Sequence, residues 1–348
     1  MPPSKRKYLR APRRELEAGN YTAGELLDEM SFTAFQGRKL GEALSVWKRM
    51  LAAKRTTVFM GLSGAMVPAG MGRLVSFLIE NRGIDVLVTT GAALSHDLYQ
   101  ALGRQHYLGT HVVDDDELQR LRIDRVYDVY ADEDGLYEAD RWVMRRMPDL
   151  LEDGRPYSSS EIAEIVGSET SKMRHGRDSI LSVAYRNKIP IFVPAFGDSS
   201  IGFALMFANR KRKRHIVVDM MRDVDQISQI TETAGSTGVV LIGGGVPKNY
   251  IQQTAVVAGY ETKREIMHKF GVSITTDSPQ WGGLSGCTFE ESKSWGKYDK
   301  SAVFATCYCD ATIDLPMLVN ALAEWKDLRS RVPPQFDWSG ERVRIRYR

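Results

Sequence analysis

Short apolar runs that alternate with helical stretches are the feature that most constrains the fold. Runs rich in β-branched residues occupy residues 57–61, 85–90, 190–194, 216–219, 239–242, 272–276 and 302–306. Strands that are apolar on both faces and joined through helices are typical of a parallel sheet covered on both sides. The sequence therefore predicts an α/β fold. We expect a single large Rossmann-like domain with a mostly parallel, doubly wound sheet of six or seven strands and helices on both faces.

The segments outside this alternation predict the ends of the domain. Residues 22–53 carry apolar side chains at helical spacing, which predicts an N-terminal helical extension. Residues 1–20 are basic and have no apolar segment after them, so we expect a flexible arm rather than a secretory signal. Residues 21–330 form the predicted main domain, and residues 331–348 a surface extension. The polar, acidic interval 110–165 predicts helices and loops that flank the sheet.

Composition and charge argue against several classes of protein. The 348 residues carry a net charge of +3, and no apolar run is long enough to span a bilayer. The three cysteines form no C-x-x-C pair, which favours neither a disulfide framework nor a metal site and fits a cytoplasmic protein. The basic run 210–214 has no interleaved aromatic residues. It predicts a solvated loop before a strand rather than a nucleic-acid surface.

Segments rich in glycine and small polar residues follow the predicted strands. They occupy residues 61–70, 89–97, 194–200, 243–249, 275–286 and 309–312. Ligands of open α/β sheets bind beyond the carboxyl ends of the strands, where glycines let backbone amides approach a pyrophosphate. The standard G-x-G-x-x-G pattern is absent from these segments. The sequence therefore predicts a dinucleotide site with a non-standard binding mode.

The segment EESKSWGK, residues 290–297, predicts a reactive lysine. Lys297 follows Trp295 and a glycine, and partial desolvation there would lower its pKa and free the amine as a nucleophile. Glu291 is suited to binding a cationic amine, and Trp295 to covering an alkyl chain or stacking on a cation. The residues alone also allow a surface lysine in a charged helix.

The chain resembles the deoxyhypusine synthase family from about residue 24 to residue 323. The resemblance rests on FQGRKLGEA (35–43), DVLVTTGA (85–92), GGGVPK (243–248), GGLSG (282–286) and SWGK (294–297). It implies that bound NAD takes a hydride from spermidine and that a lysine holds the aminobutyl group as an imine before passing it to an acceptor amine. It also implies a homotetramer with active sites across a dimer interface.

The resemblance assigns roles to individual residues. Lys297 matches the imine-forming lysine, while Glu291, Trp295, Asn249 and Gln253 match substrate-contacting positions. The positions that match cofactor contacts are Ser63, Thr90, Asp198, Gly243, Gly244, Gly245, Thr276, Ser285 and Asp310.

Several positions depart from the family pattern and alter the amine pocket. Phe203 and Leu284 stand where the eukaryotic enzymes have carboxylates, and Asn249 stands where the family has a histidine. His96 replaces a cofactor-contacting acid, and a histidine can move protons near neutral pH. We therefore predict His96 as a catalytic base; the alternative is a hydrogen bond to the cofactor or the backbone.

These departures leave the acceptor open. A lysine of the hypusine-bearing translation factor would give deoxyhypusine, whereas putrescine or another free amine would give homospermidine or a related product. A third alternative is a protein that binds NAD and polyamine without turnover.

Overall fold

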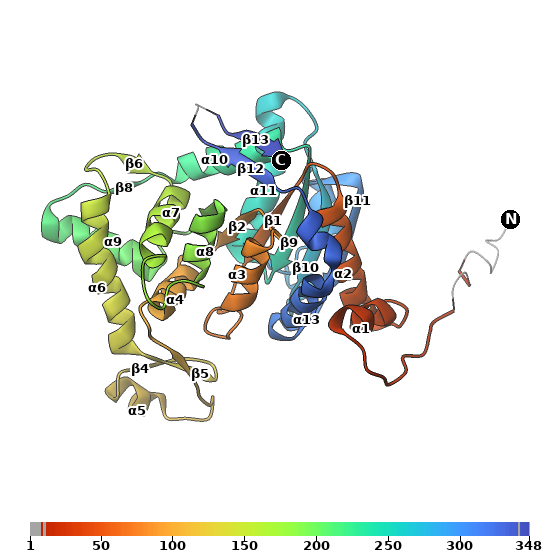
Figure 1. Cartoon of the computed structure of the whole chain (residues 1–348), viewed down its shortest axis with the longest axis horizontal. Coiled ribbons are helices and arrows are strands. Elements are labelled where there is room, and N and C mark those ends of the chain that lie inside the picture. The colour runs from red at the N-terminus through yellow and green to blue at the C-terminus, as the bar shows by residue number, and fades with distance from the viewer. Residues whose placement is uncertain (1–7, 10–11, 340–341, 348) are drawn as a thin grey trace.

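The computed structural model describes residues 8–9, 12–339 and 342–347. Its centre is a six-stranded parallel sheet in the order β11-β10-β9-β1-β2-β7. The strands are β1 (Thr56–Leu62), β2 (Val86–Thr89), β7 (Ile191–Phe192), β9 (Ser236–Ile242), β10 (His268–Ile274) and β11 (Tyr298–Cys307). This sheet, flanked by helices in Figure 1, confirms the predicted α/β fold.

Alternate residues of the strands face two separate apolar clusters, one on each side of the sheet. Met60 and Val240 belong to the larger cluster, which includes α2 (Phe35–Ala52), α3 (Gly72–Glu80) and α13 (Ala311–Glu324). Phe59 and Val239 belong to the smaller one, which includes α10 (Met220–Thr233), α11 (Gly245–Thr262) and α12 (Phe289–Ser294). Burial on both faces explains why these strands are continuously apolar in sequence. Before them, α1 (Ala23–Met30) and α2 form the predicted helical extension.

The order of the strands reverses between β1 and β9. From β1 the chain moves outward to β2 and β7, and it later returns to β9 on the other side of β1 and continues to β10 and β11. Such a reversal separates the loops that follow the two central strands and leaves a crevice at the carboxyl edge of the sheet. The position of the ligand site is therefore set by the topology.

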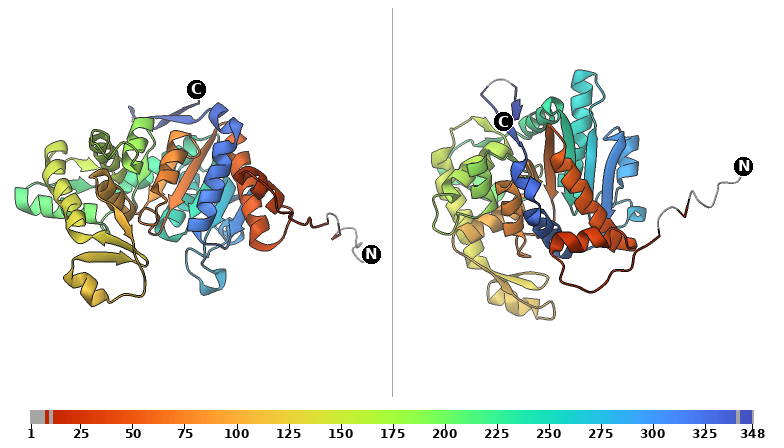
Figure 2. Two further views of the ribbon diagram at one scale, coloured as in Figure 1. Left: turned by 60° about the horizontal axis from the view of Figure 1, so that its bottom comes forward. Right: turned by 45° about the vertical axis from the view of Figure 1, so that its right-hand side comes forward.

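A small antiparallel sheet occupies part of the interval for which the sequence predicted only helices and loops. It consists of β3 (His106–Leu108), β5 (Val129–Asp132) and β4 (Ile123–Val126), with α5 (Asp115–Arg120) between β3 and β4. Figures 1 and 2 show it at the end of the molecule remote from α1. The prediction was wrong here because these strands are only three or four residues long and mix apolar with charged side chains, so no apolar alternation marks them.

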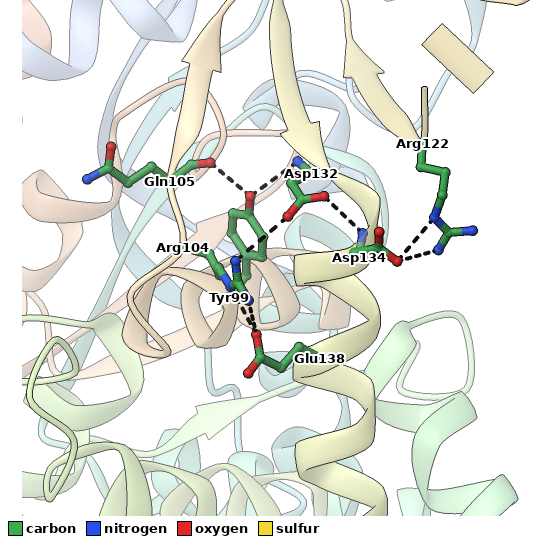
Figure 3. A network of polar contacts seen from close by, with 7 residues as sticks. All are labelled: Tyr99, Arg104, Gln105, Arg122, Asp132, Asp134 and Glu138. Carbon is green, nitrogen blue, oxygen red and sulfur yellow. Dashed lines mark hydrogen bonds and ion pairs between the residues drawn. The ribbon is translucent and has the colours of Figure 1, made fainter. Parts of the chain in front are cut away.

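Polar contacts with two helices hold this small sheet (Figure 3). Tyr99, on α4 (Gly91–Ala101), donates from its hydroxyl to the carbonyl of Gln105 at 2.8 Å. Arg104 binds Glu138 on α6 (Glu133–Leu150), and Arg122 binds Asp134 on the same helix. These side chains come from segments up to 34 residues apart, so local sequence patterns do not reveal the sheet.

A second correction concerns residues 210–219. The basic residues 210–212 end α9 (Ser200–Arg212), and Lys213 closes that helix in the left-handed conformation with φ of 52°. The following β8 (Val217–Val218) pairs with β6 (Pro156–Tyr157), outside the main sheet. Arg212 contacts Asp149 at 2.6 Å. The prediction of a loop was wrong because arginine and lysine have a high helix propensity, and the contact with Asp149 adds to it.

The chain from Arg331 onward packs back onto the amino end of the sheet. Arg331 forms a buried ion pair with Asp85, with nitrogen–oxygen distances of 2.6 and 2.8 Å. A hairpin of β12 (Pro334–Asp337) and β13 (Arg344–Tyr347) follows the short helix η3 (Lys326–Ser330). The predicted arm, residues 1–20, lies partly outside the described residues. Within the described part of the chain, no helix has the length and apolar character required to cross a membrane.

Two further helices lie at the β7 edge of the sheet. They are α7 (Ser159–Thr170) and α8 (Ile180–Asn187), which pack beside β7 and α3. The acid Asp97 on α4 accepts hydrogen bonds from the amides of Ile180 and Leu181 at 2.8 and 2.9 Å and so caps α8.

Candidate active site

Lys297 lies in the short connection between α12 and β11. Thr288 caps α12 by accepting a hydrogen bond from the amide of Glu291 at 3.0 Å. Gly296 ends the helix with φ of 70°, a conformation that costs glycine little. The carbonyl of Lys297 then accepts from the amide of His268 at the start of β10. These local features turn the lysine inward, and only 7% of its surface is exposed.

The amine of Lys297 meets a side chain of α11. Its Nζ donates to Oδ1 of Asn249 at 2.9 Å. Burial lowers the pKa of Lys297, while the neighbouring Cys287 and Glu291 act in the opposite direction. A lysine with a lowered pKa has a larger fraction of free amine at neutral pH, which is the form that attacks carbon. The prediction of a desolvated lysine therefore agrees with the geometry.

Two contacts hold α11 against β10 and β11, the strands next to Lys297. Gln252 donates from its side-chain amide to the hydroxyl of Tyr298, the first residue of β11, at 3.1 Å. The ring of the fully buried His268 approaches the carbonyl of Ile251, with 3.2 Å between Nε2 and the oxygen. Asn249 therefore reaches Lys297 from a fixed helix.

The other predicted substrate-contacting residues lie on the outer side of this lysine. Glu291 is exposed in the first turn of α12, and Trp295 is 67% exposed at its end. Gln253 is exposed on α11, four residues after Asn249, which places both on one face of the helix. The apolar replacements Phe203 and Leu284 are 51% and 40% exposed. Glu291 and Trp295 thus bring an exposed carboxylate and an exposed aromatic ring to the helix that precedes Lys297.

The triple-glycine turn joins β9 to α11 at the crevice between β1 and β9. Gly243 and Gly245 have φ of 73° and 59°. The hydroxyl of Ser63, after β1, donates to the carbonyl of Gly244, and the amide of Gly245 donates to Oγ of Ser285 at 3.1 Å. A Cβ on Gly244 would lie 2.3 Å from Cα of Ser285, so only glycine permits this approach. The structure thus brings together five predicted cofactor positions, with Ser63 and Ser285 on either side of the turn.

The same turn fits a dinucleotide. The N-cap residue Gly244 has no side chain that could cap α11, and a Cβ on Gly245 would meet no atom within 4 Å. Amides at the start of a helix, beside open space at a reversal of strand order, are the usual setting for a pyrophosphate.

The remaining predicted cofactor positions lie at the carboxyl ends of other strands. Thr90 caps α4 by accepting from the amide of Ala93, and Asp310 caps α13 by accepting from the amide of Thr312. Asp198 and Thr276 are exposed in the loops after β7 and β10. Their shared edge agrees with the prediction, and their contacts with a cofactor remain predictions.

His96 has a partner that the sequence did not indicate. Its Nδ1 lies 3.0 Å from Nε2 of His106 on β3, and Nδ1 of His106 lies 3.0 Å from the side-chain nitrogen of Gln100. Burial lowers the pKa of both histidines, that of His106 to about 4. The described contact of His96 is therefore with the small sheet rather than with Lys297 or Asn249. Its role as a base remains a prediction.

Lys248 is a second site residue that sequence reasoning missed. It is 3% exposed, and its Nζ donates to the carbonyls of Ser285 and Cys287 at 2.8 and 2.6 Å. Burial lowers its pKa, as does the charge of Lys297. Its position directly before Asn249 in GGGVPKN was the available signal.

Comparisons with known proteins show the family of this chain. The family model described as deoxyhypusine synthase matches residues 25–322. A Methanosarcina mazei protein named "Probable deoxyhypusine synthase 2" is 46% identical over 341 residues, which cover 98% of both chains. A Coxiella burnetii "Deoxyhypusine synthase-like protein" is 35% identical over 342 residues, which cover 97% of this chain and 96% of that protein.

A solved structure agrees with the fold. The crystal structure assigned to deoxyhypusine synthase from Entamoeba histolytica has a TM-score of 0.61 at 19% identity, over 85% of this chain and 91% of that one. Taken with the family match over most of the sequence, these similarities show that the chain belongs to the deoxyhypusine synthase family of transferases.

Proposed function

We propose that the protein is an NAD-dependent transferase that moves the aminobutyl group of spermidine to an acceptor amine through Lys297. The observation that carries this proposal is the buried Nζ of Lys297, 2.9 Å from Asn249. Membership of the deoxyhypusine synthase family supports the class of reaction.

The crevice between β1 and β9 is the proposed NAD site. Ser63, Ser285 and the Gly243–Gly245 turn would hold the pyrophosphate, and Thr90, Asp198, Thr276 and Asp310 would contact the rest of the molecule. Bound there, NAD supplies a hydride acceptor for the carbon beside the secondary nitrogen of the polyamine, and later a hydride donor.

Lys297 is the proposed covalent carrier. Oxidation makes the polyamine carbon electrophilic, and the free amine of Lys297 then displaces diaminopropane and holds the four-carbon amine as an imine. Asn249 orients the lysine through its amide oxygen. Glu291 binds the terminal ammonium of the substrate, and Trp295 covers the carbon chain. The acceptor amine then displaces Lys297 and regenerates it. His96 is the proposed base of the amine deprotonations.

Two acceptors fit the site. A protein lysine of the hypusine-bearing translation factor would give deoxyhypusine, the product for which the family is named. A free amine such as putrescine is the second candidate, because Phe203 and Leu284 stand where the eukaryotic enzymes have carboxylates and so alter the expected amine pocket. Mass spectrometry of products from NAD and spermidine, with putrescine or with the factor, decides between them. Diaminopropane release only with the factor would establish the protein acceptor.

Borohydride trapping tests the carrier role directly. The protein is incubated with NAD and spermidine, reduced, digested and analysed for an aminobutyl adduct. We expect the adduct on Lys297 in the wild type and none in Lys297→Arg, with Lys293→Met on α12 as the matched control. Bound NAD without any adduct would instead support the non-catalytic alternative.

We propose that the protein is cytoplasmic and that it assembles as a homotetramer. Exposed aromatic side chains at the site, with Trp295 at 67% and Trp281 at 75%, suit contact with a second protomer. Light scattering coupled to size exclusion measures the assembly.

A further inference from the structure

We propose that Lys248 is a positioning residue that holds the positive charge of a buried lysine pair and keeps Lys297 in its amine form. This inference concerns the resting site, and it rests on the proposed function only for its use in catalysis.

Lys248 has the stronger set of acceptors. Two backbone carbonyls, of Ser285 and Cys287, converge on its Nζ at 2.8 and 2.6 Å, whereas Lys297 donates to one side-chain amide oxygen at 2.9 Å. Distances below 2.9 Å are typical of bonds from an ammonium group. The negative ends of two carbonyl dipoles therefore favour the cation at Lys248 over Lys297.

The lysines are close enough to influence each other. Lys248 directly precedes Asn249, the partner of Lys297, and Cys287 and Glu291 act on the charge of both lysines. In a buried pair of this kind the first proton is lost from the more weakly held site. A charge fixed on Lys248 consequently disfavours a second charge on Lys297.

Other ionisable groups also face the pair. They come from the 275–288 segment, α12 and β10, and are Asp277, Cys287, Glu291 and His268. The carboxyl groups of Glu291 and Asp277 favour a cation at Lys248, while burial lowers the pKa of His268 to about 4 and leaves its ring neutral. The surroundings therefore accommodate one ammonium better than two.

The same bonds connect the glycine turn to α12, the helix that precedes Lys297. Ser285 accepts two hydrogen bonds. Its hydroxyl accepts one from the amide of Gly245, and its carbonyl accepts one from the amine of Lys248. Cys287 accepts from Lys248 and lies one residue before Thr288, which caps α12. Lys248 thus fixes the segment between the proposed cofactor site and the nucleophile.

Competitive acetylation tests this division of charge without turnover. The full-length protein is treated with trace acetic anhydride from pH 6 to pH 10, and mass spectrometry follows each lysine. In the wild type, we expect Lys297 to be acetylated at lower pH than Lys248 or Lys293. In Lys248→Met, acetylation of Lys297 at pH 7.5 should fall about threefold to tenfold, because one pKa unit corresponds to about tenfold in free amine.

Two further variants separate charge from packing. Lys248→Arg keeps the cation, so Lys297 should keep a profile near that of the wild type, whereas Lys293→Met should change nothing. Thermal melting establishes that each variant folds. The proposal is overturned if Lys297 has the same profile in Lys248→Met as in the wild type. If Lys248→Met does not fold, the wild-type profile alone tests the proposal. Acetylation of Lys248 at lower pH than Lys297 would then overturn it.

Failure of the proposed function would look different. A missing aminobutyl adduct with an intact acetylation profile would remove the transferase reaction and leave the lysine pair in place.

Discussion

Asn249 accepts a hydrogen bond from Lys297 at 2.9 Å through an oxygen that carries no charge at any pH. The amine of Lys297 is therefore oriented without a carboxylate, which would hold it as an ammonium ion. This relationship, between residues 48 positions apart, distinguishes the site from a lysine salt bridge.

Replacing this amide by an acid should suppress the reaction near neutral pH. Asn249→Asp places a negative charge beside Lys297 and raises its pKa, so the pH–rate profile should move upward by about one unit and the rate at pH 7.5 should fall about tenfold. Asn320→Asp, on the exposed side of α13, is the control. An unchanged profile in Asn249→Asp would show that Asn249 does not determine the charge of Lys297.

A methyl group on the glycine turn should weaken cofactor binding. Gly244→Ala places Cβ 2.3 Å from Cα of Ser285 and must displace one of the two segments. We expect NAD affinity, measured by titration calorimetry, to fall at least about tenfold. Gly37→Ala in α2, where the nearest atoms lie at 3.5 Å, should bind NAD normally. Equal affinities in the two variants would contradict the proposed NAD site.

The His96–His106 pair should make stability depend on acidity. Burial lowers the pKa of His106 from its ordinary value near 6.5 to about 4, so the unfolded chain binds more protons between these values. The stability from this group is present above pH 6.5 and is lost as the pH falls through the folded pKa. Asp97 and Asp223, whose pKa values burial raises to about 6, act in the opposite direction between pH 6 and 4.

The contribution of His106 is therefore measured as a difference between variants. After discounting for solvent screening, His106→Asn should reduce the loss of unfolding free energy between pH 6.5 and pH 4.5 by about 1 kcal/mol. Urea unfolding at several pH values measures this, with the exposed His111→Asn as control. Parallel pH profiles for wild type and His106→Asn would contradict the expected shift.

The ion pair between Arg331 and Asp85 should be essential for stability. Both side chains are buried, with 4% and 0% exposed, and Arg331 also donates to the carbonyls of Thr56 and Arg82. Arg331→Met leaves the carboxylate of Asp85 without its counter-charge, which costs about 3–5 kcal/mol. Urea denaturation compares it with Arg329→Met at an exposed position of η3. If the free energy of unfolding falls by less than about 1 kcal/mol, the ion pair is not essential and the carboxylate of Asp85 becomes hydrated in the variant.

The sequence by itself determined the class of fold and the chemistry available to it. Apolar runs between helices predict the parallel sheet, because strands buried on both faces must be apolar throughout. The glycine turn at 243–245 and the lysine after Trp295 could also be recognised in the sequence. Both lie at the end of a helix, where the backbone conformation depends on neighbouring residues.

Only the tertiary structure decided which side chains meet. Three hydrogen-bonded contacts join different elements. They are those of Lys297 with Asn249, of Lys248 with the carbonyls of residues 285 and 287, and of His96 with His106. The small sheet of β3, β4 and β5 and the departure of β8 from the main sheet follow from similar contacts. A hydrogen bond between segments depends on how whole helices and strands pack, and no local pattern of residues encodes that packing.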